Sequence, residues 1–180
     1  MVTHALPHDA VSHDAPAADA YAAVWRALGS VVDPEIPVVS IVELGIVRGV
    51  ECRDGAWTIA VAPTYSGCPA LRVIEDEVRR AVATVSHAPV RIETTLSPPW
   101  STAWIAPEAR HKLRAAGIAP PVGAAPAGGA RPIAFRRPPV RCPNCGSVRT
   151  EEIARFGSTA CKAQYRCTDC LEPFDYFKPH

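Results

Sequence analysis

The 180-residue sequence predicts an α+β domain, with helices on one face of a small mixed sheet, followed by a much smaller C-terminal β unit. Three observations predict this arrangement. Between residues 18 and 117 the hydrophobic pattern switches between helical and strand periods. Residues 118–140 are dominated by Pro, Gly and Ala, which is typical of a linker. Residues 141–180 carry two Cys-x-x-Cys pairs in a piece too small for an apolar core alone.

Composition excludes several classes of protein. Hydrophobic residues make up 48% of the chain and the formal net charge is +1, which is typical of a soluble globular protein without a polyanionic partner. No stretch approaches the roughly 20 apolar residues of a membrane helix. Residues 1–17 lack the basic start and apolar run of a signal peptide, and predict a flexible tail. Paired cysteines at this spacing favour metal binding in a reducing compartment, so we expect a cytoplasmic protein.

The first predicted element is an amphipathic helix that begins near Asp19, a plausible cap. Pro34 and Pro37 disfavour helix at the residues before them, so this helix has to end near "DPEIP". Its apolar stripe consists of Tyr21, Val24, Trp25, Leu28 and Val32.

The next elements are a hairpin, a helix, a strand and a helix. The Asp-Gly pair in "RDG" predicts a turn between strands at about 45–52 and 56–62. After Pro69 a second helix is predicted, with an apolar face made of Leu71, Ile74, Val78, Val82 and Val85. "VRIETTL" predicts a third strand, and "APEARHKLRAAG" a last helix that stops at Gly117.

The C-terminal unit contains the pattern of a zinc ribbon. Its four thiolates would come from Cys142, Cys145, Cys167 and Cys170. Each pair can wrap one side of a tetrahedral ion, and Gly146 follows the first pair where the chain has to turn. Four thiolates suit zinc or iron, and we expect structural zinc because it is the commoner use of this spacing.

Cys161 lies between the two pairs and has two interpretations. It is either a small buried residue of the ribbon, or a redox or metal-transfer thiol close to the metal. The basic residues around the ribbon are diluted by acidic ones, so nucleic-acid binding is disfavoured.

A second cysteine site is predicted in "APTYSGCPA", where a strand end, a turn and a helix start meet. Cys68 precedes Pro69 and is expected to be the N-cap, where backbone N–H groups and the helix dipole lower the pKa of a thiol. Thr64 and Ser66 add hydroxyls, and Gly67 allows close approach of the backbone to an anion or a metal. The alternative is a buried cysteine that only packs.

Two further groups are candidates for function. Asp33 and Glu35 in "DPEIP" either contribute polar groups to the same sheet edge or only cap a turn. Trp100 and Trp104 lie in "LSPPWSTAWI", a rigid segment that predicts either a docking surface or a cover for a sheet edge.

These motifs together carry a resemblance. "DPEIPVVSIVELGIVRGV" and "APTYSGCPA" resemble the small α+β family of iron-sulfur assembly proteins, which includes bacterial SufT, over about residues 19–117. With "LSPPWSTAWI" and the C-terminal "CPNCGS" and "FGSTACKAQYRC", the chain is similar to the D-subunit family of multicomponent phenylacetyl-CoA epoxidases.

The resemblance implies an accessory role in aerobic phenylacetate degradation, because other subunits of that system carry the oxygenase and reductase chemistry. It implies maturation or repair of those partner subunits. Cys68 matches the cysteine tied to iron-sulfur function, and Asp33 and Glu35 match the family's acidic opening. We therefore expect transient iron or an iron-sulfur cluster at Cys68, shared by a homodimer since one thiolate cannot saturate a cluster.

Two competing functions remain. In the first, the protein is a scaffold that binds partner subunits through the ribbon and the tryptophan segment. In the second, Cys68 is the nucleophile of an enzyme, which lacks support because a cysteine nucleophile needs a nearby histidine base and only His87 and His111 are candidates outside the chain ends.

Overall fold

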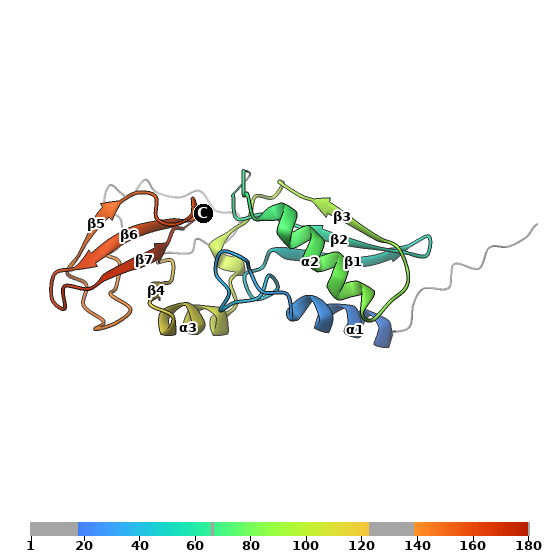
Figure 1. Ribbon diagram of the computed structural model, residues 1–180, viewed down its shortest axis with the longest axis horizontal. Helices are drawn as coiled ribbons and strands as arrows, with labels where there is room; N and C mark the ends of the chain where they lie inside the picture. The colour runs from blue at the N-terminus through green and yellow to red at the C-terminus, as the bar shows by residue number, and fades with distance from the viewer. Residues whose placement is uncertain (1–17, 66, 123–138, 180) are drawn as a thin grey trace, which may run out of the picture.

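The computed structural model describes residues 18–65, 67–122 and 139–179, which form an α+β unit and a ribbon packed end to end (Figure 1). The predicted tail, most of the predicted linker and Ser66 lie outside the described residues. Within the described ranges, no helix combines the length and the apolarity that crossing a membrane demands.

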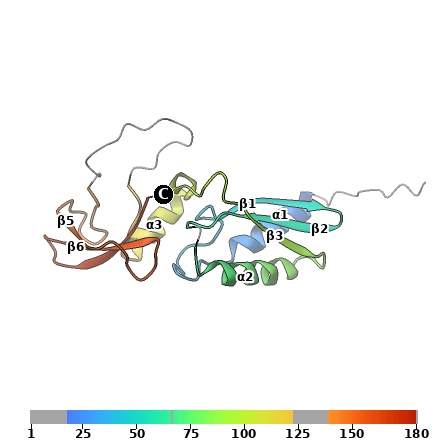
Figure 2. The ribbon, with the colours of Figure 1, turned by 90° about the horizontal axis from the view of Figure 1, so that it is seen from above.

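The α+β unit has the predicted fold class. Its sheet has the strand order β1-β2-β3, with β1 antiparallel to β2 and β2 parallel to β3. Helix α2 runs along one face of this sheet and α1 packs beside it (Figure 2). The bounds are α1 Ala18–Gly29, β1 Val47–Arg53, β2 Ala56–Val61, α2 Leu71–Ala83 and β3 Val90–Thr94.

The hairpin between β1 and β2 follows the sequence closely. Asp54 and Gly55 form the turn with φ angles of 51° and 70°, the left-handed conformation for which Asp-Gly is favoured. The strands pair from Arg53 opposite Ala56 onward. The predicted turn chemistry is confirmed.

The predicted helices are present, but their apolar stripes are shorter than expected. Val32 and Val85 are 49% and 45% exposed because α1 ends at Gly29 and α2 at Ala83. Trp25 is 37% exposed, since it is one residue off the buried line of α1. The buried positions are Val24 and Leu28 of α1 and Ile74, Val78 and Val82 of α2.

Helix α3, Pro107–Ala115, leads from the α+β unit into the ribbon. Ile118 and Ala119, which the sequence places at the start of the linker, form strand β4 and pair in parallel with β7. The ribbon sheet has the order β4-β7-β6-β5. Its other strands are β5 Thr150–Ala154, β6 Lys162–Cys167 and β7 Pro173–Phe177.

The two units share apolar packing. Cys161 and Phe177 of the ribbon are buried in the same hydrophobic cluster as the core of the α+β unit. Trp100 belongs to that cluster, with its ring centroid 5.9 Å from that of Phe177, and its Nε1–H donates to the carbonyl of Leu44 at 3.0 Å. The ribbon is therefore joined to the first unit by a packed interface.

For Trp100 this packing rules out the docking surface and favours the alternative interpretation, a cover. Trp100 is only 4% exposed, so its ring is a structural part of the interface. Trp104 ends the short helix η1, Thr102–Trp104, and the guanidinium of Arg48 stacks over its ring at 3.6 Å. Trp104 is half-buried, so its part in a docking surface stays a prediction.

Candidate functional site

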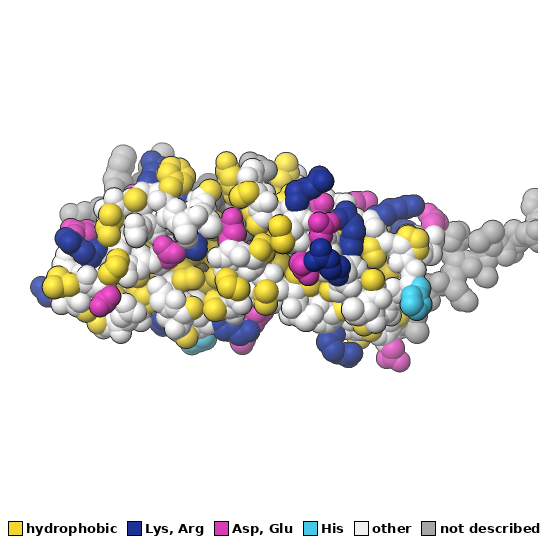
Figure 3. Space-filling model, in the orientation of Figure 1, with side chains coloured by type: hydrophobic (Ala, Val, Ile, Leu, Met, Phe, Trp, Pro, Cys, Tyr) yellow, Lys and Arg dark blue, Asp and Glu magenta, His cyan; other side chains and the backbone are white. Residues whose placement is uncertain are grey.

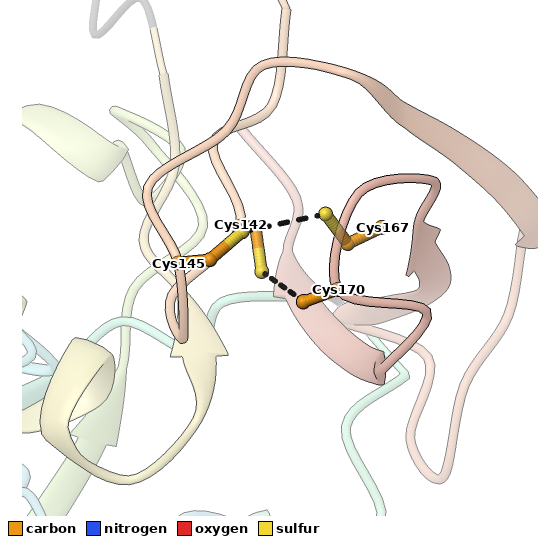
Figure 4. A group of neighbouring side chains, drawn as sticks. All are labelled: Cys142, Cys145, Cys167 and Cys170. Atoms are coloured by element: carbon orange, nitrogen blue, oxygen red, sulfur yellow. Dashed lines mark hydrogen bonds between the residues drawn. The ribbon is translucent and has the colours of Figure 1, made fainter.

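The four ribbon cysteines converge on one point (Figure 4). Cys142 and Cys145 come from the turn before β5, Cys167 ends β6, and Cys170 lies in the turn between β6 and β7. All four sulfur atoms lie within 4.8 Å of one another. Sulfur contacts of 3.7 Å and 3.5 Å join Cys142 to Cys170 and Cys145 to Cys167.

This geometry fits one tetrahedral metal ion. Four thiolates at about 2.3 Å from zinc place the sulfur atoms about 3.8 Å apart, close to the spacing of the paired sulfurs here. Gly146 adopts the positive φ of 77° that the turn after the first pair needs. The backbone N–H of Cys170, followed by hydrogen bonds from the neighbouring thiols, lowers the pKa of Cys167. The cluster can therefore hold one metal ion.

Ion pairs neutralise part of the basic charge on the ribbon. Arg149 pairs with Asp169, and Arg166 pairs with Glu151. These arginines contribute less to a polyanion surface than their number in the sequence suggests.

Cys68 belongs to the segment between β2 and α2. This segment lies at the end of the α+β unit that faces the ribbon (Figures 1 and 2). The predicted N-cap position is wrong. Helix α2 begins at Leu71, and its N-cap is Ala70, which makes no side-chain cap. Instead the backbone N–H of Cys68 donates to the carbonyl of Tyr65 at 3.0 Å, within the turn itself.

The predicted lowering of the Cys68 pKa is also wrong. Burial raises the pKa of this half-buried thiol, and the carboxylates of Glu35 and Asp33 raise it further. The backbone N–H groups of Ala70 and Leu71 act in the opposite direction, as expected near a helix start, but they are outweighed. Cys68 is therefore a protonated thiol beside two acidic groups.

The two acidic residues belong to a tight turn. The Asp33 carboxylate is 7% exposed and accepts hydrogen bonds from the backbone N–H groups of Glu35 and Ile36 at 2.9 Å and 2.8 Å. Burial, above all, raises the pKa of Asp33. The carboxylate closes the turn and also acts on Cys68, so both interpretations of "DPEIP" hold in part.

The ribbon's Cys161 approaches the same turn. Its thiol is 6% exposed and donates to Glu35 Oε2 at 3.7 Å, while the Thr159 hydroxyl lies 3.0 Å from the sulfur. Burial raises the pKa of Cys161 to about 11. Cys161 thus belongs to the core of the first unit, whereas Cys142 and Cys167 belong to the ribbon's own cluster.

Sequence reasoning missed the contact between Cys161 and Glu35. The residues are 126 positions apart, and no periodicity or spacing connects them. Of the other residues predicted for this site, Thr64 and Gly67 lie in the same turn as Cys68, and Ser66 is outside the described residues. Thr64 is half-buried, and Gly67 is exposed with the Tyr65 ring 3.0 Å from the place a Cβ would take.

The matches to known families follow this two-part construction. Residues 21–93 match the model of an iron-sulfur cluster assembly protein, and residues 130–178 match that of the PaaD zinc beta ribbon domain. The first match contains the Asp33 turn and Cys68. The second contains Cys161 and all four ribbon cysteines.

Several relatives are known. The putative D-subunit of the 1,2-phenylacetyl-CoA epoxidase of Escherichia coli K12 is 48% identical over 155 residues, which cover 86% of this chain and 90% of that protein. An "Fe-S protein maturation auxiliary factor" of Porphyromonas gingivalis is 36% identical over 92 residues, covering 50% of this chain and 87% of the relative. A crystal structure of the domain of unknown function DUF59 from Bacillus anthracis is 27% identical, has a TM-score of 0.48, and covers 53% of this chain and 92% of that one.

The first relative matches across both units, whereas the second matches over a length that one unit accounts for. Because identity to the Escherichia coli protein is high over nearly its whole length, the chain belongs to the PaaD family, in which an iron-sulfur assembly domain precedes a zinc β-ribbon.

Proposed function

We propose that the protein is an accessory subunit of a multicomponent phenylacetyl-CoA epoxidase and works in the cytoplasm in iron or iron-sulfur maturation or repair of the oxygenase or reductase components. The observation that carries this proposal is the gathering of Cys68, Glu35 and Asp33 at one end of the matched assembly domain. A thiol beside carboxylates is a donor set that can take up iron.

The chemistry of the Cys68 site suits reversible binding of iron as a cargo better than permanent binding of a metal. The thiol is protonated at neutral pH, so iron binding has to displace a proton and is reversible by reprotonation. A single thiolate leaves most coordination positions of the iron open to a recipient's ligands. A homodimer would bring two copies of Cys68 to one cluster.

The ribbon has a different role in this proposal. We propose that its four cysteines hold one structural zinc ion, because a closed four-thiolate site leaves no position for a substrate. Elemental analysis of protein purified anaerobically with iron supplied is expected to give about one zinc per chain. Iron in the ribbon, resistant to replacement by zinc, would contradict this assignment.

The maturation role is tested by producing the epoxidase components with the wild type, with Cys68→Ser, or with Cys52→Ser. Cys52 is a free cysteine on β1 and serves as the matched control. We expect iron and acid-labile sulfide in the partner components to fall with Cys68→Ser and to stay normal with Cys52→Ser. Normal metal content in the partners of Cys68→Ser would refute the role.

Apolar side chains on the ribbon favour a second candidate, a scaffold that recruits partner subunits. Ile153, Phe156 and Leu171 are 52%, 65% and 70% exposed. In Figure 3 charged side chains gather over α2, where Arg79 and Arg80 pair with acidic neighbours, and hydrophobic ones are spread over the ribbon end.

The scaffold role predicts that Phe156→Ser with Leu171→Ser abolishes complex formation in a pull-down with the other subunits, while Cys68→Ser leaves it intact. The maturation role predicts that Cys68→Ser still binds but does not restore partner iron. The two measurements, binding and partner metal content, therefore separate the candidates.

A further inference from the structure

The ribbon places a second thiol, that of Cys161, against the acidic turn whose carboxylates also act on Cys68. Cys161 follows the turn at Thr159 and lies outside the ribbon's group of four metal-binding cysteines. Its sulfur points to Glu35 Oε2 at 3.7 Å across the interface of the two units. Cys68 packs against the same hydrophobic cluster in which Cys161 is buried.

The charges around this contact are unbalanced. Glu35 and Asp33 are both acidic, and Asp33 is almost completely buried behind the turn. A basic group close to Asp33 is Lys162, which is 5% exposed and lies 3.3 Å from Asp175 of β7, so a carboxylate of the ribbon already takes up much of its charge. The ammonium of Lys178 acts on the Cys161 sulfur and donates to the carbonyl of Arg155 at 3.1 Å, so it offsets only part of the charge of the acidic turn. A divalent cation between the two thiols would compensate the two carboxylates of the turn.

We propose that Cys161 and Cys68, with the carboxylate of Glu35, bind one thiophilic divalent cation such as Fe²⁺ between the ribbon and the α+β unit. Asp33 acts as a positioning residue, since its side chain fixes the backbone of Glu35. Two thiolates and a carboxylate are ligands of borderline softness, which suits Fe²⁺, Co²⁺ or Zn²⁺. The site deepens the proposed function, on which it rests for the choice of iron as cargo.

The ligand atoms of this proposed site are farther apart than those of the ribbon cluster. In the described part of the chain, the ribbon cysteines form the only group of three or more such ligands whose atoms all lie within 4.8 Å. Cys68 is on a turn rather than in a helix or strand, and the proposal requires its side chain and that of Glu35 to move toward Cys161 when the ion binds. A site that closes on its ion binds more weakly than a preformed one, as cargo release needs.

The ribbon thus supplies a second thiol, that of Cys161, to the proposed site, and a shorter relative has no ribbon to do so. The Porphyromonas gingivalis protein matches over 50% of this chain, and 87% of its own length is used in that match. A protein of that size has no room for an equivalent of residues 141–179. In this chain the second thiol comes from the same polypeptide, so a single ion does not need a second copy, whereas a cluster would still need the two copies of the proposed homodimer.

The test is a cobalt titration of full-length protein whose ribbon has first been filled with zinc. Zinc binds thiolates more tightly than cobalt, so the ribbon keeps its ion. We expect one further cobalt ion per chain, with thiolate-to-cobalt absorption that falls by about half per bound ion in Cys161→Ser and in Cys68→Ser, because each removes one of two thiolates. Cys52→Ser should match the wild type.

Zinc content of each variant shows that the ribbon is folded, and Glu35→Gln should weaken cobalt binding by about tenfold or more without changing the thiolate absorption per ion. The proposal is overturned if Cys161→Ser binds cobalt like the wild type, or if the second thiolate proves to be Cys68 of another copy, shown by a cobalt-induced dimer. If the cobalt results are as expected but Cys161→Ser and Cys68→Ser leave partner iron normal, the binding site stands and the maturation role fails.

Discussion

The two cysteine sites of this molecule differ in construction more than in chemistry. The ribbon gathers four thiols within one small sheet, with all sulfurs within 4.8 Å. The second group takes one thiol from each of two packed units and adds carboxylates from a turn. The comparison teaches that the surroundings of a cysteine decide its use, because a closed set of four ligands stabilises a fold while an incomplete set leaves room for exchange.

The largest expected effect comes from breaking the preformed site. Cys167→Ser removes a ribbon ligand, and structural zinc sites supply roughly 10–16 kcal/mol of apparent binding free energy. We expect loss of the bound metal and rapid proteolysis within residues 139–179, measured by elemental analysis and mass spectrometry of the fragments. A ribbon that stays protease-resistant without metal would show that interface packing alone supports it.

The second expected effect concerns the packing that joins the two sites. Phe177 is 1% exposed and contacts Trp100, so Phe177→Ala should lower the free energy of unfolding by about 3–5 kcal/mol. The same change should speed alkylation of Cys161, which we expect to be slow in the wild type because burial raises its pKa to about 11. Phe156→Ala, at a side chain 65% exposed, is the control and should do neither.

A third change tests the close contact between Gly45 and Trp104. Gly45 has a φ of 69°, and a Cβ there would lie 2.6 Å from Trp104 Cβ. Gly45→Ala should therefore cost about 2–4 kcal/mol, the sum of backbone strain and overpacking. Gly55→Ala has a similar φ of 70° with open space around it and should cost only about 1 kcal/mol. Equal losses in denaturant titrations would mean that the contact with Trp104 is not tight.

The smallest expected effect is a gain in stability. The pKa of Asp33 is raised in the folded state, mainly by burial, so its contribution to stability is fully present below the ordinary pKa and is lost as the pH rises through the folded value. Asp33→Asn removes that ionisation and can still accept the turn's hydrogen bonds. Relative to wild type, its stability should rise as the pH increases from the acid range to neutrality, while cobalt binding at the interface weakens.

A stability difference that falls as the pH rises would contradict this assignment for Asp33. It would mean that the charged form is stabilised in the fold, for example by Lys162. The expected combination, higher stability with weaker metal binding in Asp33→Asn, would show that Asp33 serves function at a cost in stability.

Local patterns predicted the parts of this structure that local physics decides. The Asp54-Gly55 turn, the buried faces of α1 and α2, and the four ribbon cysteines all follow from short spacings. Helix ends were less predictable: α1 ends at Gly29, before "DPEIP", and leaves Val32 outside the helix.

The features that sequence could not predict all depend on contacts between distant segments. Trp100 is buried because Phe177 of the ribbon covers it, and Cys161 meets Glu35 because the two units pack together. The pKa direction of Cys68 was wrong for the same reason. The backbone N–H groups near a helix start are visible in sequence, but the burial and the two carboxylates that outweigh them are not.

Strand β4 has a practical consequence. It comes before residues 123–138, yet it pairs with β7, and the Arg110 guanidinium adds a hydrogen bond to the carbonyl of Pro121 at 3.0 Å. A backbone break between 122 and 139 therefore leaves both pieces with an edge of the same sheet and a share of one apolar core. We therefore expect two separately produced fragments to reassemble without a peptide bond, which would allow isotope labelling or ligand replacement in the ribbon alone.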